Sequence, residues 1–465
     1  MEKQRGTFSN RLGFIAAAAG SAVGLGNIWK FPYEVGENGG AAFLVIYLFF
    51  AFVICMPIMV GEIAMGRNTR SNPYGAFRKL GGKKWGIVGF IGVLSGIFIL
   101  SFYNVVAGWA FGYFLQITFG DLLGQSDYSA YFGDYVAHVS DNLLYSLAFM
   151  VLTALIVIAG VKKGIERWTK ILMPLLIALI VGLIIYAITL PNASAGLEFY
   201  LVPDFNNVTG KTYYMALSQA FFSLSLGMGA IITYGSYISK SDNIITSAAL
   251  VTTADALIAF MAGLLIFPLV FFQGIEPTEG PGLVFVSLPG IFEAMGPILG
   301  KIIGGGFFLL LCFAALTSTV SLLEVPTAFV TDETNYSRKK TVMGLAALVF
   351  ILGLPSMLGQ GAVGMFTEFM TYGGETKSFM GVVIDIFSDI GLPLGGFLIS
   401  IFVAYRWRTH RAADEIEQGH KHFRGSWGEK FFNVVISYIS PIVVGVMVII
   451  IFLNKFTGLD ILGGL

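Results

Sequence analysis

Hydrophobic residues in this 465-residue chain are gathered into eleven long stretches, which short polar segments separate. The stretches cover approximately residues 12–37, 40–65, 86–119, 143–160, 168–190, 212–238, 246–273, 297–330, 341–358, 376–404 and 431–453. Most of them reach the ~20 residues that an α-helix, rising about 1.5 Å per residue, needs to cross about 30 Å of hydrocarbon. The pattern therefore predicts an all-α polytopic membrane protein with eleven transmembrane helices, folded as a single domain over residues 1–465.

The basic residues indicate which end faces the cytoplasm. Polar segments on the side of the N-terminus hold 23 of the 28 Lys and Arg residues, and Lys30 lies within the first stretch. The opposite side holds the other four, Lys211, Lys301, Lys377 and Lys455. Because cytoplasmic loops carry an excess of Lys and Arg, the N-terminus is predicted to be cytoplasmic and the C-terminus external.

Composition agrees with a membrane protein and argues against several other classes. Hydrophobic residues make up 56% of the chain and charged residues 12%, and the mean hydropathy is +0.78. The formal net charge is zero, so nothing indicates a nucleic-acid partner. Cys55 and Cys312 lie in hydrophobic stretches and the four histidines lack metal-ligand spacing, which argues against a disulfide framework, a haem or a zinc site. The sequence shows neither the nucleophile–base pair of an enzyme nor the polar repeat of a channel pore.

Two of the stretches carry a glycine pair in the middle. Gly24 and Gly26 interrupt the first stretch, and Gly227 and Gly229 interrupt the sixth. Glycine costs about 1 kcal/mol relative to alanine in a helix interior, so both helices are predicted to unwind there. Broken helices five segments apart are expected of an inverted repeat, whereas close helix packing on the glycines is the alternative. The two repeats and the remaining helix 11 would cover residues 12–190, 212–404 and 431–453.

Unwound main chain in the middle of a membrane can bind ligands of both charges. Free carbonyl oxygens suit cations, and the N–H groups at the start of a half-helix suit an anion. The two breaks therefore predict a site that binds a carboxylate together with alkali ions.

Several motifs resemble those of a known family. They are Ala19-Gly-Ser-Ala-Val-Gly-Leu-Gly-Asn-Ile-Trp-Lys-Phe-Pro32, Glu37-Asn-Gly-Gly40, Glu62-Ile-Ala-Met-Gly-Arg67, Gln219-Ala-Phe-Phe-Ser-Leu-Ser-Leu-Gly227 and Ala315-Leu-Thr-Ser318. In this order they resemble the neurotransmitter:sodium symporters, and most closely the bacterial branch of that family. The resemblance implies the leucine-transporter-type fold, a 5+5 inverted repeat plus one extra helix. It also implies import of hydrophobic L-amino acids by alternating access, coupled to two sodium ions, across the bacterial inner membrane.

The same resemblance implies two sodium sites. The first would be formed by Ala22, Asn27, Ser223 and Asp255 together with the substrate carboxylate, and the second by Gly20, Val23, Ala314, Thr317 and Ser318. For the hydroxyls of Thr317 and Ser318 taken alone, hydrogen bonds to carbonyls one turn earlier in the helix are the alternative.

The substrate site implied by the resemblance would be formed by Ala22, Leu25, Gly26, Ile99, Tyr103, Phe222, Ser223, Ser225, Gly227 and Met228. Relatives that carry monoamines place an aspartate where this chain has Gly24, so here the carboxylate is expected to come from an amino acid. Met228 stands where the leucine transporter has phenylalanine, and a flexible thioether favours a broad range of aliphatic and aromatic side chains. A packed aromatic with a satisfied hydroxyl is the alternative for Tyr103.

Asp255 is a carboxylate within a hydrophobic stretch, where a charge is costly unless it has a role. Chloride-dependent relatives have a serine one turn further along, and this chain has Ala259 there. We therefore expect Asp255 to supply the negative charge that chloride supplies elsewhere, and transport to be chloride-independent. The alternative is that Asp255 moves a proton outward, which would make transport pH-dependent.

Further roles follow from the resemblance. Lys30 with Asp385 would form the outer gate, with Phe222 as its lid, and Arg5 with Asp332 would form the inner gate beside Phe8 and Tyr237. Gly164 and Pro174 resemble an element that opens a water path to the second sodium. Glu62 is expected to accept hydrogen bonds from the unwound sixth segment, and Glu324 to belong to the inner pathway.

A transporter-like sensor, which binds an amino acid without moving it, is the alternative function. The partners expected from the sequence are the hydrophobic amino acid and the lipid bilayer. The sequence does not identify an oligomeric partner.

Overall fold

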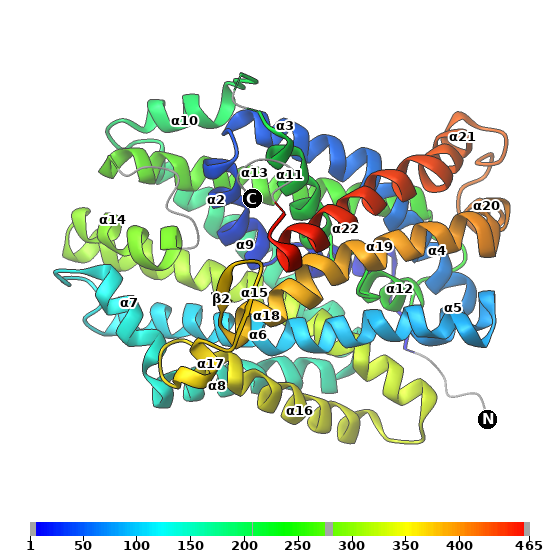
Figure 1. Ribbon diagram of the computed structural model, residues 1–465, viewed down its shortest axis with the longest axis horizontal. Coiled ribbons are helices and arrows are strands. Elements are labelled where there is room, and N and C mark those ends of the chain that lie inside the picture. Colours follow the sequence, from blue (N-terminus) through cyan, green and yellow to red (C-terminus); the bar gives the residue numbers. More distant parts are fainter. Residues whose placement is uncertain (1–5, 207, 275–281, 460–465) are drawn as a thin grey trace.

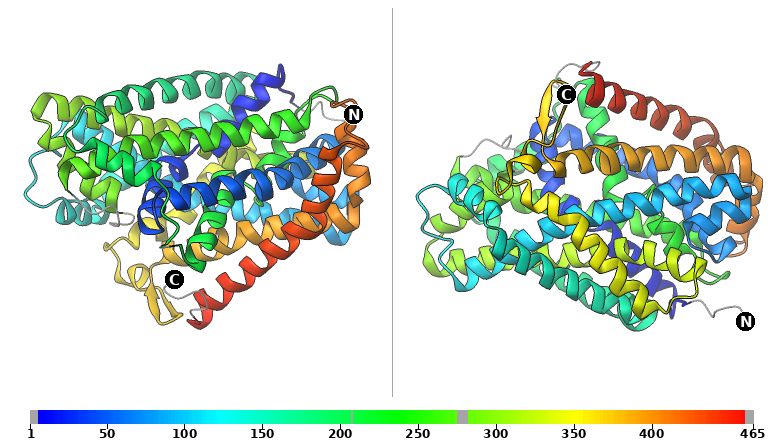
Figure 2. Two further views of the ribbon diagram at one scale, coloured as in Figure 1. Left: turned by 90° about the horizontal axis from the view of Figure 1, so that it is seen from above. Right: turned by 60° about the horizontal axis from the view of Figure 1, so that its bottom comes forward.

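Long helices lie side by side along the longest axis of the molecule (Figures 1 and 2). The computed structural model describes residues 6–206, 208–274 and 282–459. The longer helices are α3 (Ala41–Phe50), α4 (Met56–Thr69), α6 (Gly86–Phe119), α8 (Val139–Ile158), α9 (Arg167–Ala187), α13 (Ile244–Gln273), α15 (Pro297–Glu333), α16 (Arg338–Leu358), α19 (Gly391–Ile401) and α22 (Ser440–Thr457). Their lengths and apolar composition confirm an all-α membrane protein.

Short π-helical and 3-10 turns join several helices into longer spans. The π-helical turns are Gly26–Lys30 (η1), Ala51–Cys55 (η2), Val161–Glu166 (η4), Leu283–Ser287 (η5), Ile384–Ile390 (η6), Phe402–Arg408 (η7) and Val435–Ile439 (η8), and the 3-10 turn is Lys83–Trp85 (η3). Through these turns α3 continues into α4, and α19 is continuous with α18 (Phe379–Val383) and α20 (Thr409–Glu417). α21 (Trp427–Val434) continues into α22 in the same way.

Nine helical segments within the described residues are long and apolar enough to cross a membrane. A tenth membrane-crossing segment is a bent pair of helices, α1 (Arg11–Ala22) and the segment Gly26–Glu37, which meet at an angle of 50°. The second segment includes α2 (Phe31–Glu37). The predicted sixth span is divided into α11 (Gly210–Ser223) and α12 (Ala230–Gly235), each too short to cross alone. The count of eleven spans therefore stays a prediction.

The two breaks lie where the glycine pairs predict them. α1 ends with the Val23 N–H donating to the Ala19 carbonyl. Between α11 and α12, Gly227 and Gly229 adopt φ of 83° and 79°, a left-handed conformation that glycine takes at low cost. The freed N–H of Gly227 donates to Glu62 Oε1 at 2.9 Å, which confirms the role expected for Glu62. The division into two inverted repeats stays a prediction.

Short elements cap the two ends of the helix bundle. At one end lie α7 (Tyr128–Ala137), α10 (Ala193–Leu201), α14 (Leu288–Ala294), α17 (Gly364–Thr367) and the antiparallel hairpin of β1 (Met370–Tyr372) and β2 (Glu375–Lys377). At the other end lie α5 (Pro73–Gly81) and α20, near the start of the described chain (Figure 1). The charge rule places this second end in the cytoplasm.

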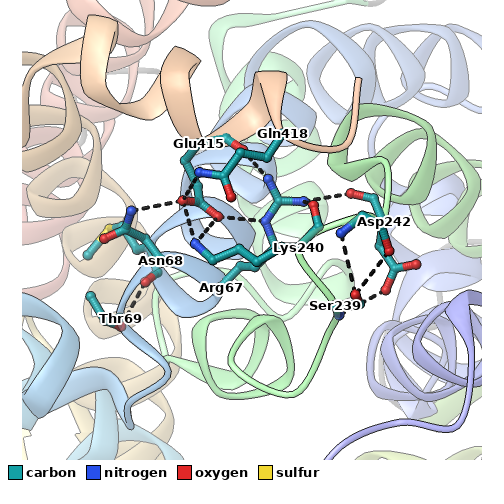
Figure 3. A network of polar contacts seen from close by, with 10 residues as sticks. Arg67, Asn68, Thr69, Ser239, Lys240, Asp242, Glu415 and Gln418 are labelled. Carbon is teal, nitrogen blue, oxygen red and sulfur yellow. Dashed lines mark hydrogen bonds and ion pairs between the residues drawn. The ribbon is translucent and has the colours of Figure 1, made fainter. Parts of the chain in front are cut away.

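A buried ionic network ties the cytoplasmic ends of three segments together (Figure 3). Arg67, at the end of α4, is fully buried and donates to Glu415 of α20 at 2.7 Å. Arg67 also donates to the carbonyls of Lys240 and Asp242, in the loop after α12, at 3.2 and 2.6 Å. Lys240 Nζ and Asn68 Nδ2 each lie 2.8 Å from Glu415 Oε2. Gln418 Nε2 adds a fourth donor at 3.2 Å, and these donors compensate the cost of burying the Glu415 charge.

We expect Arg67→Met to lower the unfolding free energy by about 3–5 kcal/mol, because it removes the buried cation that pairs with Glu415 and the donor to the carbonyls of Lys240 and Asp242. Thermal unfolding in detergent would measure the change. Arg78→Met is the matched control, since the Arg78 side chain is 40% exposed and pairs with Glu333 at 3.0 Å. The control should lose less than about 1 kcal/mol. Equal losses in the two variants would contradict a stabilising role for the buried network.

Candidate functional site

The broken ends of two helices meet around a small pocket in the middle of the bundle. The pocket has a volume of about 20 Å³ and is lined by Ser21, Ala22, Gly24, Gly26, Ile99, Tyr103, Phe222, Ser223, Ser225, Met228, Ser318, Ser321, Leu322 and Leu392. Eight of the ten residues predicted for the substrate site are in this lining. The other two, Leu25 and Gly227, lie directly beside it, with their main chains bonded to Tyr103 and Glu62.

One wall of the pocket presents groups suited to a carboxylate. The Leu25 N–H, freed by the break in the first span, donates to the Tyr103 hydroxyl at 2.8 Å. A Cβ atom added to Gly24 would lie 2.4 Å from Ser318 Oγ and 2.7 Å from Tyr103 Oη. Both distances are too short for a real side chain, so only glycine lets these two hydroxyls lie this close to the main chain.

Asp255 of α13 lies at the centre of a fully buried polar cluster. Its Oδ1 accepts hydrogen bonds from Asn27 Nδ2 and Ser223 Oγ, each at 2.7 Å. Asn27 Nδ2 also lies 2.9 Å from Ser223 Oγ. Ala22 lines the adjoining pocket. The structure thus brings the four residues predicted for the first sodium to one place, while their role as sodium ligands stays a prediction.

Tyr47 joins this cluster and was missed by the sequence reasoning. It is fully buried on α3, and its hydroxyl donates to Asp255 Oδ2 at 2.9 Å and lies 3.5 Å from Ser223 Oγ. A tyrosine in an otherwise hydrophobic span is a signal, because its buried hydroxyl needs a partner. That the partner lies 208 residues away in the chain could not be seen from the sequence.

A second group of oxygen atoms lies where α15 meets the broken first span. Thr317 Oγ1 is 2.9 Å from the Ala314 carbonyl and 3.3 Å from the Val23 carbonyl, and Ser318 Oγ is 3.4 Å from the Val23 carbonyl. Gly20 packs on Thr317, since an added Cβ would lie 3.4 Å from the Thr317 Cβ. Bonds within α15 and bonds across to the first span are therefore both present. The five residues predicted for the second sodium are together, and their role stays a prediction.

A larger cavity of about 820 Å³ lies on the external side of the pocket. Gly26, Tyr103 and Phe222 line both spaces, so these three residues form the boundary between them. The cavity wall also includes Lys30, Glu34, Asp389 and Lys455, and it reaches the hairpin of β1 and β2. Phe222 thus lies between the larger cavity and the pocket, and its role as a lid stays a prediction. We call the larger cavity the vestibule.

The predicted outer gate pair is not formed in this structure. Lys30 Nζ is 3.9 Å from Glu34 and lies 5.1 Å from the centre of the Phe222 ring. Asp385 pairs instead with Lys377 at 3.3 Å and with Lys455. An open vestibule keeps the two sides of a gate apart, so the Lys30–Asp385 pair stays a prediction for the closed vestibule.

On the cytoplasmic side the start of the described chain packs against α12. The Phe8 N–H donates to the Tyr237 carbonyl at 3.2 Å, and the Phe8 ring contacts those of Tyr234 and Tyr237 edge to face. The Tyr237 hydroxyl donates to Glu324 at 2.7 Å, so Glu324 contacts a residue of the predicted inner gate, and its part in the inner pathway stays a prediction.

Of the predicted inner gate pair, Arg5 lies outside the described residues. Its predicted partner, Asp332, accepts hydrogen bonds from the main-chain N and Nδ2 of Asn72, each at 3.0 Å.

The predicted release element lies at the cytoplasmic start of the fifth span. Gly164 is in the π-helical turn η4, and Pro174 lies inside α9. A Cβ on Gly164 would come within 1.9 Å of the Ile156 carbonyl, so only glycine fits. Glu166 in the same turn accepts a hydrogen bond from the Ser9 N–H at 2.8 Å. These contacts connect the turn to the N-terminal segment, and its role in sodium release stays a prediction.

A central pocket bounded by the unwound parts of two membrane helices, and approached from one side, is the arrangement of a secondary transporter. The sequence profile of the Sodium:neurotransmitter symporter family matches residues 5–131 and 126–461. The crystal structure of MhsT in complex with L-phenylalanine superposes with a TM-score of 0.87 at 43% identity, covering 97% of this chain and 100% of that chain.

Proteins with similar sequences are also sodium-dependent transporters. An uncharacterized sodium-dependent transporter of Bacillus subtilis is 37% identical over 450 residues, which are 96% of this chain and 97% of the relative. The sodium-dependent serotonin transporter of Drosophila melanogaster is 28% identical over 498 residues, covering 95% of this chain and 75% of the relative. The chain belongs to the Sodium:neurotransmitter symporter family. It is a sodium-dependent, multi-pass membrane transporter with the leucine-transporter-type fold, and not an enzyme.

Proposed function

We propose that the protein imports hydrophobic L-amino acids, both aliphatic and aromatic, with two sodium ions and without chloride. Transport would proceed by alternating access across the bacterial inner membrane. The observation that carries this proposal is the pocket wall at Gly24, where the Leu25 N–H and the Tyr103 hydroxyl meet and the described lining residues include no acidic side chain. Such a wall accepts an anionic group from the substrate, and an amino acid brings one.

The cluster around Asp255 supports a first sodium without chloride. The Asp255 carboxylate and Ser223 Oγ offer oxygen ligands 2.7 Å apart beside the substrate pocket, and Asn27 contacts both of them through Nδ2. Oxygen ligands with one negative charge suit a hard monovalent cation. A bound substrate carboxylate would add a ligand, so substrate and ion would each increase the affinity of the other.

The oxygen atoms between α15 and the first span support a second sodium. They come from two main-chain carbonyls, those of Val23 and Ala314, and two hydroxyls, those of Thr317 and Ser318. No carboxylate is among them, which favours a monovalent over a divalent ion. These oxygens come from both the broken first span and α15. A sodium ion bound between them would therefore stabilise one relative position of the two segments.

The apolar wall of the pocket supports a hydrophobic side chain on the substrate. Ile99, Phe222 and Met228 line it, with Ser225 as the small polar neighbour. At about 20 Å³ the pocket holds no amino acid side chain without movement of these residues, and Met228 can change rotamer at low cost. MhsT, the structure at 43% identity, was solved with L-phenylalanine, which agrees with a substrate of this class.

We expect Met228→Phe to narrow the substrate range. The rigid ring would take the space that a bulky side chain needs, so the apparent affinity for tryptophan should fall about tenfold relative to that for valine. Competition of each amino acid against labelled leucine would measure the ratio. Met228→Leu, which keeps a flexible aliphatic side chain, is the matched control, and an unchanged ratio in Met228→Phe would place the side-chain site elsewhere.

Uptake into liposomes tests the proposed function. Purified protein is reconstituted, and accumulation of labelled leucine and tryptophan is followed with an inward sodium gradient, with chloride or gluconate as the anion. We expect accumulation that needs sodium and not chloride. Sodium-dependent binding without accumulation would indicate a sensor instead, and no binding of either amino acid would contradict the substrate class.

A further inference from the structure

The carboxylate of Asp385 is held by groups from two elements that belong to neither broken helix. Lys455, near the end of α22, forms an ion pair with Asp385, and its Nζ lies 2.9 Å from Asp389 Oδ2. From the hairpin, Lys377 Nζ lies 3.3 Å away and the Tyr372 hydroxyl donates at 2.7 Å. Asp385 is only 3% exposed, so these partners meet most of its hydrogen-bonding capacity.

The hairpin of β1 and β2 lies beside the end of α22 (Figure 2). The Tyr372 ring stacks on Phe456, with 5.1 Å between ring centres. Gly373 packs so closely that an added Cβ would lie 2.4 Å from the Lys455 carbonyl. Partial burial and the adjacent Asp385 raise the pKa of the Tyr372 phenol above its ordinary value, so Tyr372 stays a hydrogen-bond donor at neutral pH.

Lys30 shares the vestibule with Lys455 but has other partners. It lies 3.9 Å from Glu34 and over the ring of Phe222, and it makes no ion pair with Asp385 among the described residues. Asp385 carries one negative charge and here has two cations, Lys455 and Lys377. Pairing with Lys30 therefore requires an exchange of partners, which has a free-energy cost that depends on how strongly Lys455 holds the carboxylate.

We propose that Lys455 is a positioning residue of the outer gate. It holds Asp385 in the open vestibule and gives up the carboxylate to Lys30 when the vestibule closes. The proposal rests on the proposed function, transport by alternating access, with Lys30 and Asp385 as the predicted closing pair. It assigns to helix 11, which lies outside both predicted repeats, a direct part in the transport cycle. Because Lys455 binds Asp385 only in the open vestibule, it increases the population of that state. Removing its amine should therefore favour the closed vestibule.

The rate at which a cysteine in the vestibule wall reacts with an external reagent would measure the shift between the open and the closed vestibule. Ser218 of α11 lines the vestibule, whereas both native cysteines, Cys55 and Cys312, are buried. Ser218→Cys would be labelled with a membrane-impermeant maleimide in sodium without substrate. We expect Lys455→Gln to slow labelling about threefold or more, and Lys455→Arg, which keeps the charge, to slow it less. Unchanged labelling in Lys455→Gln would overturn the proposal.

A Lys30→Gln background separates exchange of partners from a packing defect. Without Lys30 the proposed closing partner of Asp385 is missing, so Lys455→Gln should no longer slow labelling. Slowing that persists in this background would overturn the proposal, because it would show that Lys455 acts only through the packing of α22.

Asp389→Asn is a further variant that does not depend on the folding of Lys455→Gln. It leaves Lys455 with Asp385 as its carboxylate partner, so labelling should be no slower than in the parent, and slower labelling would also overturn the proposal. Uptake by wild-type protein in the same liposomes tests the proposed function separately, because labelling in sodium alone involves no substrate.

Discussion

Asp255→Asn is expected to reduce sodium-dependent uptake at least ~100-fold. The carboxylate is fully buried among Asn27, Ser223 and Tyr47, and no other acidic side chain contacts this cluster in the described part of the chain. In the proposed site it is the only fixed negative charge facing the first sodium. Loss of one partner from a buried charge pair costs about 3–5 kcal/mol, and about 1.4 kcal/mol corresponds to a factor of ten.

Chloride provides the specific control for this variant. The double variant Asp255→Asn, Ala259→Ser introduces the hydroxyl that chloride-dependent relatives have one turn further along, so chloride should restore part of its uptake. Asp134→Asn, in the exposed external helix α7, should leave uptake and its anion dependence unchanged. If wild-type uptake varied with internal pH and Asp255→Asn lost that variation, Asp255 would carry a proton, and its role as a fixed charge would be wrong.

Gly24→Asp is expected to abolish amino acid binding, with an affinity loss of at least ~100-fold. The new carboxylate would start at a Cβ within 2.7 Å of both Ser318 Oγ and the Tyr103 hydroxyl, and Tyr103 belongs to the wall proposed for the substrate carboxylate. Two like charges in a desolvated site repel each other by several kcal/mol. Equilibrium binding of labelled leucine in sodium would measure the loss.

Gly24→Asn separates charge from volume. Asparagine has almost the same shape as aspartate and must displace the same two oxygen atoms, but it carries no charge. We expect Gly24→Asn to weaken leucine binding less than Gly24→Asp does. Equal losses would mean that crowding alone explains the effect, and the argument that the substrate supplies the missing carboxylate would lose its support.

Much of the fold could be predicted from the sequence because its signals are local. The thickness of the bilayer determines how long an apolar stretch must be, so hydropathy locates most of the spans. The glycine pairs predicted both breaks, because a left-handed backbone such as that of Gly227 and Gly229 has a low cost only in glycine. In the structure the break divides the sixth span into two short helices, α11 and α12, neither of which is long enough to cross a membrane by itself.

The candidate site was predicted mainly through resemblance, and the partners of its charged groups were not. Tyr47, which is distant from Asp255 in the sequence, donates a hydrogen bond from its hydroxyl to the Asp255 carboxylate. The arrangement of the vestibule differs from the expected gate, because Asp385 pairs with Lys455 and Lys377 while Lys30 lies over Phe222. The sequence contains several lysines that could pair with Asp385. Only the folded structure shows which of them lie close enough to do so.

The sequence by itself therefore determined that this is a polytopic membrane protein, how the chain is oriented across the membrane, where two helices unwind and which family it belongs to. These properties depend on residue type and spacing along the chain, which hydropathy, charge and backbone preference express directly. The tertiary structure alone decided which side of the pocket is open, which hydroxyl completes the Asp255 cluster and which lysine holds Asp385. Electrostatic and hydrogen-bond partners act through space over a few ångströms, so only the packing of helices distant in sequence can select them.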